Sequence, residues 1–454
     1  RERSASIARQ SSAYGRPHAS HSVLRRRSYL PSIGVVKPPT TSYYHVPLHG
    51  VVHILATLCC ISAMESGGKA MPYITDRVVH DADSHAMELP DWFSEFGTEK
   101  VKKAFNHRFK YGIDLQELST LHKSPEYRSR NEAEIMSRKN YQALGAFDRE
   151  DRSEAVDHIG VASQLVFPTS PNVWLEQLEH GDDIDLLYQV ADATNRAQTD
   201  FCANDPRLFP VGYVPLADLE QTSHATEHAL SLGAKALLIP WACPKNHATS
   251  HIALDALWSR AEEADVPILF HVGAADRVLP VAHANNGLPP VADFHGGEEN
   301  FRSISYMAIS QGPIQALSLL ILDGVLDRFP TLKFGVIELG AVWLPGFMRQ
   351  LDSAFEAFAR HEDRLKKLSL RPSEFVTRQV RITPYPTEPT GWIISQTSPD
   401  ICMFSTDYPH LEGGRNPLGR FDKATLELVD SDRDRFFRAN FEDLMGSAFR
   451  GAQT

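Results

Sequence analysis

Short apolar runs alternate with longer amphipathic stretches along the chain from residue 77 onward. The runs are rich in Val, Ile and Leu, as buried strands are, and the stretches between them repeat apolar residues at helical spacing. The predicted strands are Arg77–His85, Gly160–Phe167, Leu208–Leu216, Ala234–Pro240, Val266–Gly273, Lys333–Gly340, Val380–Pro384 and Ile401–Pro409. The predicted helices include Asp182–Thr199, Glu220–Leu232, His251–Ala264 and Ser310–Arg328.

This alternation predicts an α/β fold built on a parallel sheet. Strands that are apolar on both faces suit a sheet covered by helices on both sides, so a doubly wound sheet and a (β/α)8 TIM barrel both meet the pattern. Eight strands in succession favour the barrel. Its loops after the strands cover the face that carries the active site. We therefore expect a helical cap inserted after strand one (residues 86–159, with helix-prone Glu132–Tyr141) and an active-site loop at 274–309.

The first 70 residues differ in charge from the rest. They hold nine basic and two acidic residues, a net +7, which leaves −18 for the other 384 residues of a chain whose total is −11. An Arg-rich and Ser-rich leader resembles an organellar transit peptide, and the apolar run Val51–Cys60 resembles part of a signal peptide. A disordered extension is the third interpretation and the one we adopt. We expect residues 1–70 to be an extension or leader, and residues 71–454 to form one barrel domain.

Composition excludes several classes of protein. With 42% apolar and 23% charged residues, the chain is neither collagen-like, coiled-coil nor wholly disordered. No run approaches the roughly 18 apolar residues of a membrane span. The net negative charge argues against nucleic acid as a partner, and five cysteines without a CxxC pair argue against a disulfide framework or a Cys zinc site. We expect a cytoplasmic protein that acts on a small molecule, with a homodimer left open.

Polar residues with metal-binding chemistry gather at the ends of four predicted strands. Strand one ends in Asp81-Ala82-Asp83-Ser84-His85, and residues two apart on a strand point the same way, so Asp81, Asp83 and His85 are expected to form one row facing the interior. Buried charges need a partner, and a divalent metal is the simplest partner for a carboxylate beside an imidazole. The alternative is that these side chains merely reach solvent.

The other three strand ends add ligands to the same rim. His271 follows the apolar run of strand five, Glu338 ends strand six and Asp407 ends strand eight. Each has an ordinary explanation: a core histidine, a rim carboxylate paired with an arginine, or a strand end. Four such ends on one face of a barrel favour a shared site over coincidence.

These motifs, in this order, resemble the amidohydrolase-related family of metal-dependent barrels, in the branch that includes aminocarboxymuconate-semialdehyde decarboxylase. The resemblance covers about residues 76–450, and the stretches that carry it are VVHDADSHAMELPDWF, LFHVG, LDGVLDRFPTLKFGVIELGAVWLPGFMRQLD, FSTDYPHLEGG and SDRDRFFRANFEDLMG. It implies that Asp83, His85, His271 and Asp407 hold one divalent metal ion. Zinc is the first choice, and manganese is the second because a carboxylate replaces a histidine.

One departure from the family bears on the reaction. Decarboxylases of this branch generally carry a histidine at the end of strand six, where this chain has Glu338. Relatives with glutamate there include C–C bond hydrolases. We therefore expect a hydrolase of a C–C or C–N bond in which Asp407 and Glu338 are catalytic. The alternatives are a non-oxidative decarboxylase and an inactive barrel that serves as a binding protein. The candidates for substrate contact are His410, His295 and Arg302.

Overall fold

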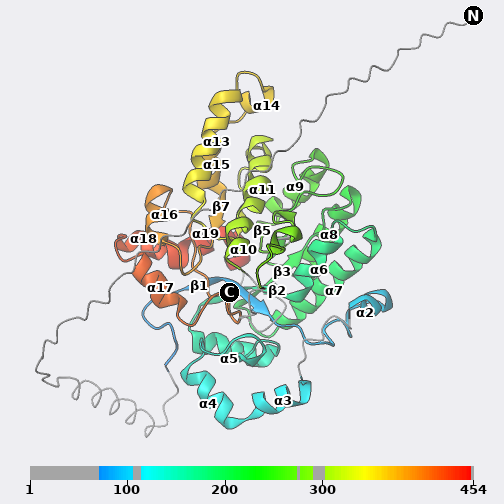
Figure 1. Ribbon diagram of the computed structural model, residues 1–454, viewed down its shortest axis with the longest axis vertical. Helices are drawn as coiled ribbons and strands as arrows, with labels where there is room; N and C mark the ends of the chain where they lie inside the picture. The colour runs from blue at the N-terminus through cyan, green and yellow to red at the C-terminus, as the bar shows by residue number, and fades with distance from the viewer. Residues whose placement is uncertain (1–70, 106–113, 274–276, 290–301, 451–454) are drawn as a thin grey trace, which may run out of the picture. The chain divides into compact units, whose positions relative to one another are not determined.

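The computed structural model describes residues 71–105, 114–273, 277–289 and 302–450. Within them, seven parallel strands form one sheet in the order of the chain, each paired with the next (Figure 1). The predicted extension, residues 1–70, lies outside the described residues. The strands are β1 (His80–Ala86), β2 (Ser163–Pro168), β3 (Leu208–Tyr213), β4 (Ala236–Leu238), β5 (Ile268–Phe270), β6 (Phe334–Val336) and β7 (Val380–Ile382).

An extended segment, residues 401–408, closes the sheet between β7 and β1. Cys402 pairs with Ile382, and Tyr408 pairs with Ser84, both in the parallel sense. These pairs are isolated bridges, so the prediction of a regular eighth strand at Ile401–Pro409 is wrong. A bulge in β1, between Asp81 and Ser84, interrupts the hydrogen-bond ladder there. The fold is nevertheless the expected α/β TIM barrel, because the segment completes the ring.

Helices follow the strands and surround them (Figure 1). Several begin at an aspartate that accepts backbone N–H bonds, as Asp148 and Asp218 do, and Gly160 and Gly233 end the same two helices in the left-handed conformation. The helices are α2 (Glu99–Phe105), α3 (Leu115–Lys123), α4 (Pro125–Ala133), α5 (Arg149–Ile159), α6 (Ser170–Leu178), α7 (Ile184–Cys202), α8 (Leu219–Leu232), α9 (Asp255–Glu263), α10 (Ser303–Ile309), α11 (Gln311–Leu322), α12 (Val325–Arg328), α13 (Leu344–Phe358), α14 (Asp363–Lys366), α15 (Pro372–Gln379), α16 (Thr390–Gln396), α17 (Pro417–Ala424), α18 (Asp430–Asp434) and α19 (Asn440–Arg450).

The insertion after β1 is helical, as expected, but one of its helices is misplaced in the prediction. α4 ends at Ala133 and a short 3₁₀ helix spans Asn140–Gln142, so the expected helix at Glu132–Tyr141 is wrong for the residues between them. Asn140 has a φ of 53°, and its N–H donates to Pro409 O at 2.8 Å. Glu134, directly after α4, has φ −139° and ψ 48°, outside the helical range, so the helix ends well before this contact with the distant segment.

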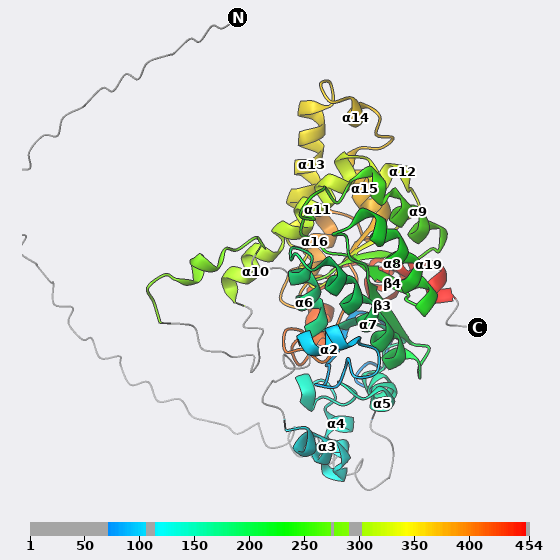
Figure 2. The same cartoon turned by 90° about the vertical axis from the view of Figure 1, so that its right-hand side faces the viewer.

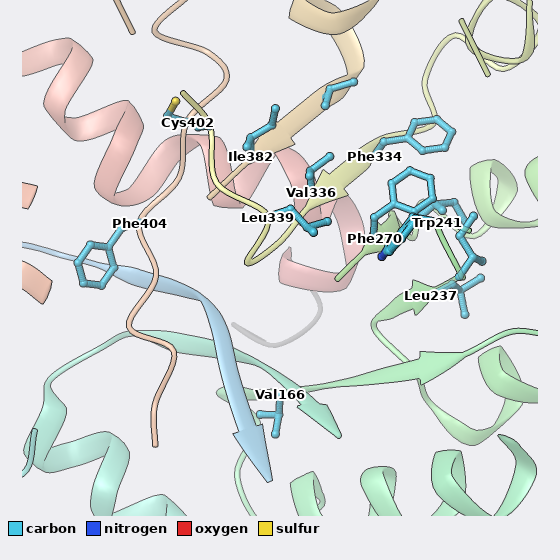
Figure 3. Close-up of a cluster of buried hydrophobic side chains, with 14 of the residues drawn as sticks. Val166, Leu237, Trp241, Phe270, Phe334, Val336, Leu339, Ile382, Cys402 and Phe404 are labelled. Carbon is cyan, nitrogen blue, oxygen red and sulfur yellow. The ribbon is translucent and has the colours of Figure 1, made fainter. Parts of the chain in front are cut away.

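Alternate residues of the strands point to two separate apolar cores. The outer core lies between the sheet and the helices, and it contains Phe270, Phe334, Val336 and Ile382 (Figure 3). The inner core fills the barrel with the intervening residues, such as Leu165, Val211 and Leu269. Phe441, Leu444 and Met445 of α19 belong to the inner core, so the last helix closes the end of the barrel where the strands begin.

One described stretch, Ser303–Leu322, is long and apolar enough by length and composition to cross a membrane. This stretch consists of α10 and α11. In Figure 2, α10 lies to one side of the helices that surround the barrel. Leu317, Leu320 and Ile321 of α11 are fully buried in the outer core. Packing within the barrel therefore accounts for the apolar character of α11.

Candidate metal centre

Four buried side chains meet where β1, β5 and β6 end. His85 Nε2 lies 3.3 Å from Asp83 Oδ1, and His271 Nε2 lies 3.4 Å from the same oxygen. Glu338 Oε2 is 3.4 Å from His271 Nε2 and 4.0 Å from His85 Nε2. One ligand atom from each of these residues fits within 4.8 Å of all the others. The structure thus brings together two imidazoles and two carboxylates that the sequence places 255 positions apart at their extremes, from Asp83 to Glu338.

Asp407 joins this cluster from the segment that closes the barrel. Its Oδ1 lies 3.6 Å from His85 Nε2, and its N–H donates to Asp83 O at 2.9 Å. Asp407 and Glu338 both have positive φ angles, 53° and 55°, in the left-handed region that side chains other than glycine seldom adopt. Two carboxylates are therefore aimed into one site at the cost of backbone strain, which is typical of functional positions.

Asp81 does not lie in the expected row with Asp83 and His85. Its carboxylate accepts bonds from the N–H and hydroxyl of Thr406, at 2.7 and 2.6 Å, and from Gln164 Nε2 at 2.8 Å. The bulge in β1 breaks the strand alternation, and Ala82 takes the inner position. Burial raises the pKa of Asp81 to about 7. Asp81 thus bonds the segment of residues 401–408 to β1, next to Asp407.

The oxygen and nitrogen atoms of the cluster do not satisfy one another by hydrogen bonds, and a bound cation would satisfy them. Six of them are buried and make no hydrogen bond within the described part of the chain: Asp83 Oδ1, His85 Nδ1, His85 Nε2, His271 Nε2, Asp407 Oδ1 and Asp407 Oδ2. Such groups cost free energy unless a partner satisfies them. Burial, together with His410 and His271 nearby, lowers the pKa of His85 well below its usual value. A neutral imidazole is the form that binds a metal ion.

The three residues expected to contact substrate have different outcomes. His410 is buried within the site: its ring stacks on that of His85 with centroids 3.9 Å apart, and its Nδ1 lies 3.2 Å from Asp407 Oδ1. His295 lies outside the described residues. Arg302 precedes α10 and, among the described residues, makes no hydrogen bond or ion pair with the cluster. Substrate contact by these residues stays a prediction.

Two further residues near the site were not predicted from the sequence. Lys139 comes from the insertion after β1, and its buried Nζ has no hydrogen-bond partner within the described residues. Burial lowers the pKa of Lys139 to about 8, and the attraction of Asp407 opposes that shift. Tyr385 follows β7 and donates from its hydroxyl to Glu338 O at 2.7 Å. Lys139 lies in the insertion, away from any predicted strand end. Tyr385 directly follows the predicted strand Val380–Pro384, but tyrosine is not among the residue types that mark a metal site, so the pattern did not single it out.

Comparisons with known proteins show the family and the fold of the chain. The chain matches the family model of the amidohydrolases (Amidohydro_2) over residues 139–445. No curated protein sequence matches it. An amidohydrolase structure from Mycobacterium avium subsp. paratuberculosis has a TM-score of 0.62 at 21% identity, and the match covers 82% of this chain and 100% of that one.

Two structures of decarboxylases are also similar. The 5-carboxyvanillate decarboxylase of Novosphingobium aromaticivorans, with bound manganese, has a TM-score of 0.56 at 18% identity over 83% of this chain and 99% of that one. The 2,6-dihydroxybenzoate decarboxylase from Rhizobium has a TM-score of 0.52 at 17% identity, over 81% and 98%. At these identities the likeness establishes the shared fold.

Proposed function

Because the chain belongs to the amidohydrolase family, we propose that it is a metal-dependent hydrolase of a C–C or C–N bond in a small carboxylated or cyclic substrate. The observation that carries this proposal is the position of Glu338, whose carboxylate lies 3.4 Å from His271 Nε2 inside the ligand cluster. A carboxylate beside a cation stays ionised. It therefore suits a base or a ligand better than it suits an acid that protonates carbon.

The residues divide the work as follows. Asp83, His85, His271 and Asp407 would hold one divalent ion, with Glu338 as a further donor, and that ion would lower the pKa of a bound water molecule toward 7. Asp407 accepts a proton from the attacking water and returns it to the leaving group. Glu338 orients that water, or takes the proton in place of Asp407. His410, 3.2 Å from Asp407, holds the Asp407 carboxylate in place.

The charge of the three carboxylates bears on the choice of reaction. Asp83, Glu338 and Asp407 together carry three negative charges when ionised, and one divalent cation leaves a net charge of −1 on these groups. A protonated Lys139 nearby offsets that charge. Charge alone therefore does not separate hydrolysis from decarboxylation, and the position of Glu338 carries the proposal.

We propose manganese as the ion, ahead of the zinc that the sequence favoured. Glu338 adds an oxygen donor, so three carboxylates and two imidazoles surround the site. Oxygen-rich sets suit harder ions such as manganese, whereas zinc favours nitrogen and sulfur donors. The structure of 5-carboxyvanillate decarboxylase with bound manganese is in keeping with this choice. Elemental analysis of the purified protein, expressed with both metals in the medium, tests it.

A second candidate function is non-oxidative decarboxylation. Two observations favour it: His410 lies beside Asp407 and offers a proton donor, and the buried Nζ of Lys139 brings a positive charge near the same carboxylate. The two structures of decarboxylases with this fold add weight. In this candidate the substrate loses carbon dioxide and His410 supplies the proton that replaces it.

Reaction in ¹⁸O-labelled water separates the two functions. A panel of small carboxylated aromatic and cyclic compounds first identifies a substrate by its consumption. Hydrolysis predicts ¹⁸O in the product carboxylate and no carbon dioxide. Decarboxylation predicts carbon dioxide and a product without new oxygen. If the metal-loaded protein consumes none of the panel, an inactive binding protein becomes the better interpretation.

Glu338→Gln provides the matching test on the chain itself. Removing a positioned base costs roughly 10²–10⁴-fold in rate, so hydrolysis should fall by that factor in this variant. A matched control is Glu356→Gln, because Glu356 lies on α13 and pairs with Arg371 at the protein surface. Unchanged turnover in Glu338→Gln contradicts the role given to this residue.

A further inference from the structure

The turn that carries Glu338 is held by side chains from the segment after β7. The N–H of Glu338 donates to Thr383 Oγ1 at 2.9 Å, and its carbonyl accepts from Tyr385 Oη at 2.7 Å. The φ of 55° at Glu338 costs a non-glycine residue on the order of 1–2 kcal/mol. Both polar groups of this strained backbone unit are thus bonded to side chains two residues apart.

Glu388 forms hydrogen bonds with the residues that follow Glu338 in the turn. Its carboxylate accepts the N–H groups of Ala341 and Val342, at 2.9 and 3.0 Å, and the N–H of Tyr385 at 2.9 Å. A Cβ built on Gly340 would lie 3.0 Å from Glu388 Oε1 and 3.2 Å from the Tyr385 ring. The turn therefore fits closely against Tyr385 and Glu388, with little room to shift.

We propose that Tyr385 is a positioning residue, which fixes the backbone of Glu338 so that the Glu338 carboxylate reaches the metal-ligand cluster. The proposal rests on the proposed function only in placing Glu338 among the groups that face the ion. The carboxylate sits 3.4 Å from His271 Nε2 through a side chain of three rotatable bonds. Rotation of the strained peptide displaces it. The hydroxyl of Tyr385 opposes that rotation by bonding the peptide oxygen.

A metal-binding cycle tests the proposal without a substrate. Mn²⁺ affinity is measured by competition with a chelator for the wild-type protein, Tyr385→Phe, Glu338→Ala and the double variant. Outer partners of a metal ligand are worth roughly 10–100-fold in affinity, so Tyr385→Phe should weaken Mn²⁺ binding about 10-fold. Since Tyr385 acts through Glu338, the double variant should bind Mn²⁺ no more weakly than Glu338→Ala alone.

Tyr188→Phe is the matched control. The Tyr188 hydroxyl also donates to a backbone carbonyl, Asp218 O, at 3.0 Å, but in α7, away from the site. This variant should bind Mn²⁺ like the wild type. Thermal unfolding of all variants, recorded without metal, separates a loss of fold from a loss of position.

The same cycle can overturn the proposal. Wild-type Mn²⁺ affinity in Tyr385→Phe, or losses that add in the double variant, shows that Tyr385 does not act through Glu338. If Tyr385→Phe fails to fold, Thr383→Val takes its place, because it removes the acceptor of the Glu338 N–H and is expected to weaken Mn²⁺ binding similarly. A protein that turns over no substrate contradicts the proposed function but leaves this affinity test intact.

Discussion

β1 carries a buried histidine near each of its ends, and the two lie in opposite surroundings. His80, the first residue of the strand, is 2% exposed, and His85, the residue before the last, is 1% exposed. His80 Nδ1 lies 2.8 Å from Ser163 Oγ, its Nε2 lies 3.5 Å from Glu442 Oε1, and its ring stacks on Phe441. Neither ring nitrogen of His85 has a hydrogen-bond partner among the described residues.

The difference lies in what each end of the barrel supplies. Where the strands begin, α19 provides an apolar wall and a carboxylate, and Ser163 bonds His80 Nδ1. His80 thus has a hydrogen bond at one ring nitrogen, while its Nε2 makes none among the described residues. Where they end, His85 is surrounded by groups that we also propose as metal ligands, namely Asp83, Asp407 and His271. Burial alone therefore does not identify a functional histidine. Several buried donor atoms without partners that face one another, as around His85, are more telling, because such a group needs a partner from outside the chain.

The largest expected effect comes from removing the histidine at the functional end. His85→Ala should weaken metal binding by more than about 100-fold, beyond the loss from an outer partner, and abolish activity. His80→Ala should keep metal binding within a factor of about two of the wild type, since it touches only the opposite end. Metal content after dialysis, with activity on the identified substrate, measures both.

The free energy of unfolding should show the opposite order of effects from metal binding, with the larger loss in His80→Ala. In the presence of a chelator, His85→Ala should be at least as stable as the wild type, because it removes two unsatisfied buried nitrogens. His80→Ala should lose about 1–3 kcal/mol through its bonded partners. If urea unfolding instead shows equal losses for the two variants, the contrast between the ends of β1 is wrong.

The next largest effect concerns the stability provided by α19, which covers the end of the barrel where the strands begin. Phe441 of α19 is 1% exposed, and it packs on His80 and Phe209. Phe441→Ala should destabilise the protein by about 3–5 kcal/mol, as the loss of a buried phenylalanine does, while the folded variant still binds one metal ion. Leu426→Ala is the control, because Leu426 is 70% exposed and should change stability by less than about 0.5 kcal/mol. Loss of metal binding in folded Phe441→Ala would link the two ends.

The sequence predicted which side chains gather at the ends of the strands better than it predicted the backbone geometry that brings them together. Seven strands and the positions of His85, His271 and Glu338 follow from periodicity, because alternating apolar runs and strand ends are local properties. The bulge in β1, the left-handed backbone of Glu338 and Asp407, and the bonds of Asp81 to Thr406 depend on residues far apart in the chain. Lys139 and Tyr385 reach the site only through the fold. No local pattern records such contacts.

The smallest expected effect is a pH dependence that belongs to His80. Burial lowers the pKa of His80 to about 4, against the attraction of Glu442, whereas the unfolded chain has an ordinary histidine pKa near 6.5. As pH falls from about 6.5 toward 4, the unfolded state takes up a proton that the folded state refuses, so stability is lost across that window and is fully present above it. In metal-free protein, the wild type should therefore lose about 1–2 kcal/mol more stability between pH 7 and pH 5 than His80→Gln does. Urea unfolding at the two pH values measures this difference. A steeper loss of stability in His80→Gln than in the wild type would mean that the surroundings of His80 stabilise the charged imidazole. The contrast between His80 and His85 would then not be explained by the partners of each ring.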